Sequence, residues 1–61
     1  MIIKDKNICG GIPIIKGTRI TVAVILANIR DGIPFTEICD DYHINNQDIT
    51  DCLDYVIKKV E

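Results

Sequence analysis

The spacing of hydrophobic positions predicts three amphipathic helices in the C-terminal two thirds of the chain. Apolar side chains recur every three or four residues over 22–29, 35–42 and 49–60. This spacing places them on one face of a helix. The third stripe is the longest, and its members are Ile49, Cys52, Leu53, Val56, Ile57 and Val60. Three amphipathic helices with short links predict a mainly α, trihelical bundle.

The ends of these helices carry recognisable start and stop residues. Thr21 is a suitable N-cap for the first helix, and Gly32 is a suitable residue just beyond its C-terminus. Asn45 precedes the third helix, with Asp48 three residues later in a position typical of a capping box. The tight turn between the second and third helices makes them a candidate helix-turn-helix.

Residues 1–20 lack helical periodicity and predict a β-hairpin. Two β-prone runs, at 12–15 and 18–20, flank the short link Lys16-Gly17. Pro13 cannot donate a hydrogen bond to a sheet, so we expect its strand to be an edge strand.

The length of 61 residues limits the chain to one domain, 1–61, with a β-hairpin arm over 1–20 and a trihelical bundle over 21–61. A core this small often needs a partner subunit, so we expect a homodimer formed through the edge strand. No apolar run approaches the roughly 20 residues of a membrane helix, and no signal-peptide pattern is present. We therefore expect a cytoplasmic protein without membrane contact.

The chain offers little catalytic or metal-binding chemistry. It has three cysteines without a C-x-x-C pair, and His43 is its one histidine. A zinc site needs four suitably spaced ligands, and no set of nucleophile, base and orienting group can be assembled. The acidic residues of the third helix match no calcium loop and are expected to be solvated. We expect neither enzymatic activity nor a cofactor.

Charge is distributed unevenly along the chain. Residues 1–30 hold five basic side chains and one acidic side chain, whereas residues 31–61 hold two basic and eight acidic ones. A basic and an acidic half favour two different binding surfaces, and the alternative for the acidic half is ordinary solvated charge.

The most distinctive polar cluster is formed by Lys16, Thr18 and Arg19 at the expected hairpin turn. Two cations and a hydroxyl there suit a phosphate or a carboxylate-lined cleft, and arginine can bind either group bidentately. In the alternative, Arg19 pairs within the chain with Asp31 or Asp41, and Thr18 completes the turn.

A second candidate is the start of the third helix, which reads Asn45-Asn46-Gln47. Asparagine and glutamine side chains match the donor and acceptor pair of adenine in the major groove. The alternative is simple capping by Asn45 with solvated neighbours. Acidic residues further along this helix would repel DNA phosphates.

The run from Gly10 to Ile20 has the pattern G-G-x-P-x-I-x-G-T-R-I, which resembles the opening of the "domain of unknown function 433" family. Further similar positions are Asp31-Gly32, Glu37-Ile38, Asp41-Tyr42, Asp48-Ile49 and Leu53-Asp54-Tyr55. The resemblance implies a homeodomain-like trihelical fold preceded by a β-hairpin. It also implies an antitoxin encoded beside a PIN-like ribonuclease toxin.

We therefore expect a small antitoxin-like protein that neutralises a PIN-like ribonuclease and binds operator DNA to regulate its own operon. The candidate contacts are Lys16, Thr18, Arg19, Asn45, Asn46 and Gln47. The alternative is a pure protein-interaction module that does not bind DNA.

Overall fold

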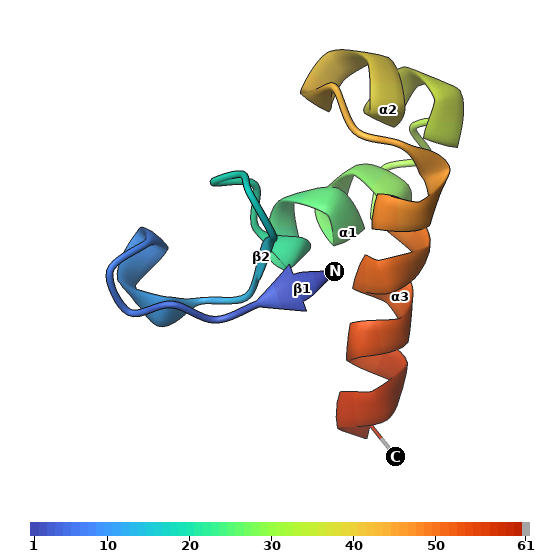
Figure 1. The fold of residues 1–61 in the computed structure, drawn as a ribbon. Coiled ribbons are helices and arrows are strands. Elements are labelled where there is room, and N and C mark those ends of the chain that lie inside the picture. Colours follow the sequence, from blue (N-terminus) through green and yellow to red (C-terminus); the bar gives the residue numbers. More distant parts are fainter. Residues whose placement is uncertain (61) are drawn as a thin grey trace.

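The computed structural model describes residues 1–60 and has three helices preceded by a short antiparallel hairpin (Figure 1). Its elements are β1 (Ile2–Ile3), a short 3-10 turn η1 (Cys9–Gly11), β2 (Ile14–Ile15), α1 (Val22–Arg30), α2 (Phe35–Tyr42) and α3 (Asn46–Val60). The expected mainly α fold with an N-terminal hairpin is therefore confirmed. None of the helices in residues 1–60 is long and apolar enough to cross a membrane.

One aliphatic cluster joins the sheet to all three helices. Its buried members are Ile15, Val22, Ile25, Ile38, Ile49 and Cys52. No polar or charged side chain is buried within residues 1–60. Full burial of each aliphatic side chain contributes about 1.5–3 kcal/mol, so this cluster is the main source of stability.

The pairing in the hairpin differs from the expected one. β2 pairs with β1, with Ile2 opposite Ile15 and Ile3 opposite Ile14, and not with a strand at 18–20. An isolated bridge to Thr21 flanks Ile14 on its other side. The sheet has two strands, so β2, which directly follows Pro13, is an edge strand as expected, although Ile14 and Ile15 also make backbone contacts with Thr21 and Ile20.

The turn after β2 explains why 18–20 forms no strand. The Thr18 hydroxyl donates to the Ile15 carbonyl at 2.8 Å and accepts from the Ile20 N–H at 3.0 Å. The Ile15 N–H also donates to the Ile20 carbonyl at 2.9 Å. The side chain of Thr18 thus adds two hydrogen bonds to the backbone bonds of the turn and closes a tight loop.

Helix α1 begins and ends at the residues expected from the sequence. The Thr21 hydroxyl accepts a hydrogen bond from the backbone N–H three residues later, at 3.1 Å. At the other end Gly32 has a φ of 80°, its N–H donates to Ile29 O, and the Ile33 N–H donates to Asn28 O. This pair of bonds satisfies two free carbonyls of the last turn, and it requires a left-handed residue.

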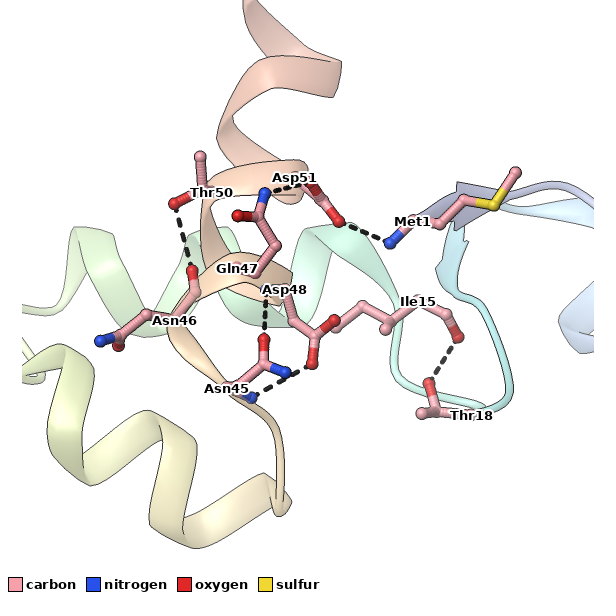
Figure 2. A network of polar contacts seen from close by, with 9 residues as sticks. All are labelled: Met1, Ile15, Thr18, Asn45, Asn46, Gln47, Asp48, Thr50 and Asp51. Carbon is pink, nitrogen blue, oxygen red and sulfur yellow. Dashed lines mark hydrogen bonds and ion pairs between the residues drawn. The ribbon is translucent and has the colours of Figure 1, made fainter.

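Helix α3 has the expected capping box (Figure 2). The Asn45 side-chain oxygen accepts from the Asp48 N–H at 2.9 Å, and the Asp48 carboxylate accepts from the Asn45 N–H at 3.1 Å. Two N–H groups at the start of the helix are therefore satisfied reciprocally.

The apolar stripe of α3 extends beyond the core. Ile49 and Cys52 are fully buried and the next two members are half-buried, but Ile57 is 54% exposed and Val60 is 80% exposed. The apolar face predicted from the spacing is therefore buried in its first part and exposed at its last two members. Helix α3 has 15 residues whereas α1 has 9 and α2 has 8, so the shorter helices end before α3 does.

We predict that the same substitution at the two ends of this stripe has different costs. Ile49→Val should lower the free energy of unfolding by about 0.5–1.5 kcal/mol, because it opens a cavity in the core. Ile57→Val should change it by less than about 0.5 kcal/mol, because the side chain is largely solvated. Urea unfolding of both variants measures the difference, and equal costs would contradict the burial of Ile49.

Helix α2 ends at a strained residue. His43 is exposed and has φ 56° and ψ 45°, in the left-handed region, while the Ile44 N–H donates to Cys39 O at 3.1 Å. Glycine is the usual residue at this position, because a Cβ makes the left-handed conformation unfavourable by roughly 1–2 kcal/mol.

We predict that His43→Gly raises the free energy of unfolding by about 0.5–1 kcal/mol, since relief of this strain exceeds the added entropy of the unfolded chain. The melting temperature should rise by roughly 2–8 °C in a domain of this size. His43→Ala is the control, because it removes the imidazole and keeps the Cβ. A gain with alanine equal to that with glycine would assign the effect to the imidazole.

Candidate binding site at the hairpin turn and helix α3

A polar network joins the chain's first residue, the hairpin turn and helix α3 (Figure 2). The ammonium group of Met1 donates to the Asp51 carboxylate at 2.5 Å, and the Gln47 amide donates to the other oxygen of Asp51 at 2.9 Å. On the other side, the Lys16 N–H donates to the Met1 carbonyl at 2.8 Å. The turn therefore lies close to the first two turns of α3.

The turn presents its two cations outward. Lys16 and Arg19 are exposed, whereas Thr18 is half-buried and its hydroxyl is used by the backbone. Gly17 has a φ of 82°, which lets the chain reverse without strain. Thr18 is thus a structural residue of the turn, and the two cations are the groups available to an external ligand.

Arg19 does not form the ion pair within the chain that was the alternative to external binding. Among residues 1–60 the ion pairs join Met1 to Asp51 and Arg30 to Asp31, and Arg19 is in neither. Asp31, one of its two expected partners, instead accepts from the adjacent Arg30 at 3.2 Å.

The three amides at the start of α3 have different surroundings. Asn45 caps the helix, Asn46 accepts a weak contact from the Cys39 thiol at 3.5 Å, and Gln47 binds Asp51. All three are exposed. Gln47 belongs to the same network as the hairpin turn, while the contacts of Asn45 and Asn46 connect them to α3 itself and to α2.

Sequence reasoning missed Met1 and Asp51 as members of this site. The spacing of four residues between Gln47 and Asp51 was a usable signal, because such residues are neighbours on a helix. The contact of Met1 with Asp51 spans 50 positions and has no local signal.

A family model described as "Protein of unknown function (DUF433)" matches residues 2–56. The chain belongs to this family. The matched region runs from β1 through most of α3, so it contains every candidate contact residue of this DUF433 protein. No curated protein and no solved structure matches the chain.

No group of three or more histidine, cysteine or carboxylate side chains comes together among residues 1–60 of the DUF433 protein. The chemistry of the described surface is therefore that of exposed cations, amides and separate carboxylates. Such groups make ion pairs and hydrogen bonds to a partner.

Hydrogen bonds from the Met1 ammonium and the Gln47 amide lower the pKa of Asp51 below its ordinary value, because both favour the ionised carboxylate. A depressed carboxyl pKa stabilises the folded state above the pKa of the unfolded chain. The stabilising contribution of the carboxylate is lost as the pH falls through the pKa that Asp51 has in the folded state.

We predict that part of the acid sensitivity of this protein comes from Asp51. Stability should fall as the pH drops below about 4, the ordinary carboxyl range, and Asp51→Asn should make this decline less steep. Urea unfolding at neutral and acidic pH measures it. Asp54→Asn is the control, because Asp54 is exposed and lies outside the network. An unchanged decline in Asp51→Asn would show that the carboxylate is not held as described.

The three cysteines are free thiols in different environments. Burial raises the pKa of Cys52 to about 11, and the nearby carboxylates of Asp48 and Asp51 add to this effect. Cys9 and Cys39 are half-buried. Because the thiolate is the reactive form, Cys52 should be inert in the folded protein.

We predict that a thiol reagent at neutral pH labels Cys9 and Cys39 in the native protein and Cys52 only after unfolding. Mass spectrometry of labelled peptides identifies the sites. Cys52→Ser should leave the labelling of Cys9 and Cys39 in the native protein unchanged, and it should remove the slow labelling that requires unfolding. Rapid labelling of Cys52 would contradict its burial in the core.

Proposed function

We propose that this DUF433 protein is a small antitoxin-like binding protein, with no catalytic role, that acts in the cytoplasm. In this proposal it neutralises a PIN-like ribonuclease and binds operator DNA to regulate its own operon. The observation that supports it most directly is the pair of exposed cations, Lys16 and Arg19, on a turn whose backbone is held by Thr18.

A fixed turn favours binding because less conformational entropy is lost when its side chains meet a partner. The planar guanidinium of Arg19 can make two parallel hydrogen bonds to a carboxylate or a phosphate. A carboxylate-lined nuclease cleft and the DNA backbone both offer such groups, so one turn suits either partner.

DNA binding is further supported by the start of α3. Helices α2 and α3 are joined by the short link 43–45, and the first turn of α3 exposes Asn46 and Gln47. Amide side chains in this position can read adenine in the major groove. The Met1 ammonium offsets the charge of Asp51, one of the carboxylates that would repel phosphates.

The acidic residues of α3 favour a second candidate, a protein-interaction module without DNA binding. Asp48, Asp51 and Asp54 lie along α3 and give part of it a negative surface. Such a surface would complement the basic, RNA-binding face of a nuclease. Both candidates share the ribonuclease as partner and differ only in DNA binding.

We predict that Arg19→Ala leaves the fold intact and weakens binding by at least roughly ten-fold, or about 1.4 kcal/mol. The assays are thermal melting, titration with the product of the neighbouring gene and titration with the protein's own promoter DNA. Arg30→Ala is the matched control, because it removes the same charge from an exposed site at the end of α1.

Each partner gives a separate result. If Arg19→Ala loses ribonuclease binding, and the unmodified chain binds no DNA at any salt concentration, the results favour the protein-interaction module. DNA binding that weakens steeply with salt and is reduced by Arg19→Ala supports the full proposal. If Arg19→Ala binds both partners as tightly as the unmodified chain does, the proposed site is wrong.

A further inference from the structure

Two more exposed cations lie on the loop that joins β1 to β2, residues 4–13. They are Lys4 and Lys6. The loop extends away from the three helices, as its blue ribbon shows (Figure 1). Together with the hairpin turn, residues 16–19, this loop forms a basic arm. The arm holds four exposed cations, which are Lys4, Lys6, Lys16 and Arg19.

The loop of the basic arm is folded back on itself. The Ile8 N–H donates to the Asp5 carbonyl at 2.8 Å, and the Gly11 N–H donates to the Ile8 carbonyl at 3.1 Å. A Cβ added at Gly11 would lie 3.4 Å from the Lys6 Cα, so the end of the loop packs closely against its start. A loop held in this way loses less conformational entropy when it meets a partner.

The loop also contacts the hairpin turn. The Cys9 thiol donates to the Arg19 carbonyl at 3.7 Å. At the start of the turn, the Lys16 N–H donates to the Met1 carbonyl, which directly precedes β1. The loop and the turn therefore form one structural unit, and the cations of both can meet the same partner.

The charge of the basic arm is not compensated within residues 1–60. None of its four cations forms an ion pair there. Asp5 is the one acidic residue among the first twenty, and its carboxylate accepts from the Asn7 N–H at 2.9 Å. Residues 21–61 hold three basic and eight acidic side chains. A polyanion is therefore attracted to the arm and repelled by the rest of the chain.

The cations of the arm are too widely spaced to hold one small anionic group. Lys4 directly follows β1 and Lys16 directly follows β2, and the two strands are antiparallel. The two lysines therefore leave the sheet at opposite ends, three strand positions apart, which is about 10 Å. Each strand of duplex DNA carries one phosphate per about 3.4 Å of helix axis. Evenly repeated phosphates offer every cation a partner, whereas carboxylates gathered in one cleft reach only part of the arm.

We propose that the basic arm binds the phosphate backbone of duplex DNA, with Lys4 and Lys6 as contacts in addition to Lys16 and Arg19. This inference rests on the DNA-binding part of the proposed function, and it names the groups that supply the sequence-independent attraction. Lysine suits this role because its ammonium group is a compact point charge that needs no matched geometry. The polar network described above holds the hairpin turn close to the first turns of α3. Phosphate contacts there orient the amides that read bases.

The salt dependence of DNA binding counts these contacts. Each neutralised phosphate releases counterions, so log K falls against log salt with a slope of about −0.9 per phosphate. Four contacts give a slope of about −3.6. The double variant Lys4→Ala with Lys6→Ala should reduce the slope to about −1.8, because two contacts remain. Titration of a fluorescent duplex of arbitrary sequence at about 50–200 mM salt measures the slope.

The double variant Lys58→Ala with Lys59→Ala is the matched control, because both lysines are exposed on the last turn of α3, outside the arm. It removes the same charge and should leave the slope at about −3.6. Lys4→Arg with Lys6→Arg keeps the charge of the arm and should also leave the slope unchanged. Thermal melting verifies that each variant is folded. An unchanged slope in the alanine variant of the arm, or an equal reduction in the control, overturns the proposal.

The outcomes separate this inference from the proposed function. Binding of arbitrary DNA through the arm, without preference for the protein's own promoter, supports the arm as a DNA contact and contradicts operator regulation. A preference for the promoter, with a salt slope that does not depend on Lys4 and Lys6, overturns the inference and leaves operator binding in place. Weaker binding of the neighbouring gene product with an unchanged DNA slope assigns the two lysines to that protein and also overturns it. A chain that binds no duplex at about 50 mM salt overturns both.

Discussion

The rest of the structure depends on the packing of a few aliphatic side chains where the helices and the sheet meet. Ile25, Ile38 and Ile49 come from three different helices and are fully buried. With three free cysteines and no buried polar side chain in residues 1–60, apolar burial is the chain's main stabilising term. Because this term is not directional, hydrogen bonds at the helix ends position the helices. The caps by Thr21 and Asn45 and the left-handed residue Gly32 have this role.

A feature of this fold could be predicted from the sequence where the residues that cause it are close together along the chain. Helix periodicity and caps act within four residues, so the three helices could be inferred from residues such as Thr21 and Asn45. Strand β1 has two residues and no pattern of its own, and its pairing with β2 is a tertiary contact. Periodicity also predicts the apolar face of α3, but it does not show how far the neighbouring helices extend along that face. For this reason the spacing alone did not show that Ile57 lies at the surface.

The candidate site was predictable to a similar extent. Exposed cations next to a glycine could be identified from residue type, and Lys16 and Arg19 do lie at the surface. Thr18 has the same polarity, but its hydroxyl is used twice by the turn, which depends on three-dimensional geometry. The contact between Met1 and Asp51 joins residues 50 positions apart, and only the folded chain brings them together.

Two faces of α3 hold the candidate contact residues in place. On one face, Ile49 and Cys52 are fully buried in the aliphatic core. On another face, Asp51 accepts from the Met1 ammonium and from the Gln47 amide. Met1 in turn accepts from the Lys16 N–H at the start of the hairpin turn. Apolar burial therefore fixes α3 within the fold, and the polar contacts fix the hairpin turn relative to the first turns of this helix.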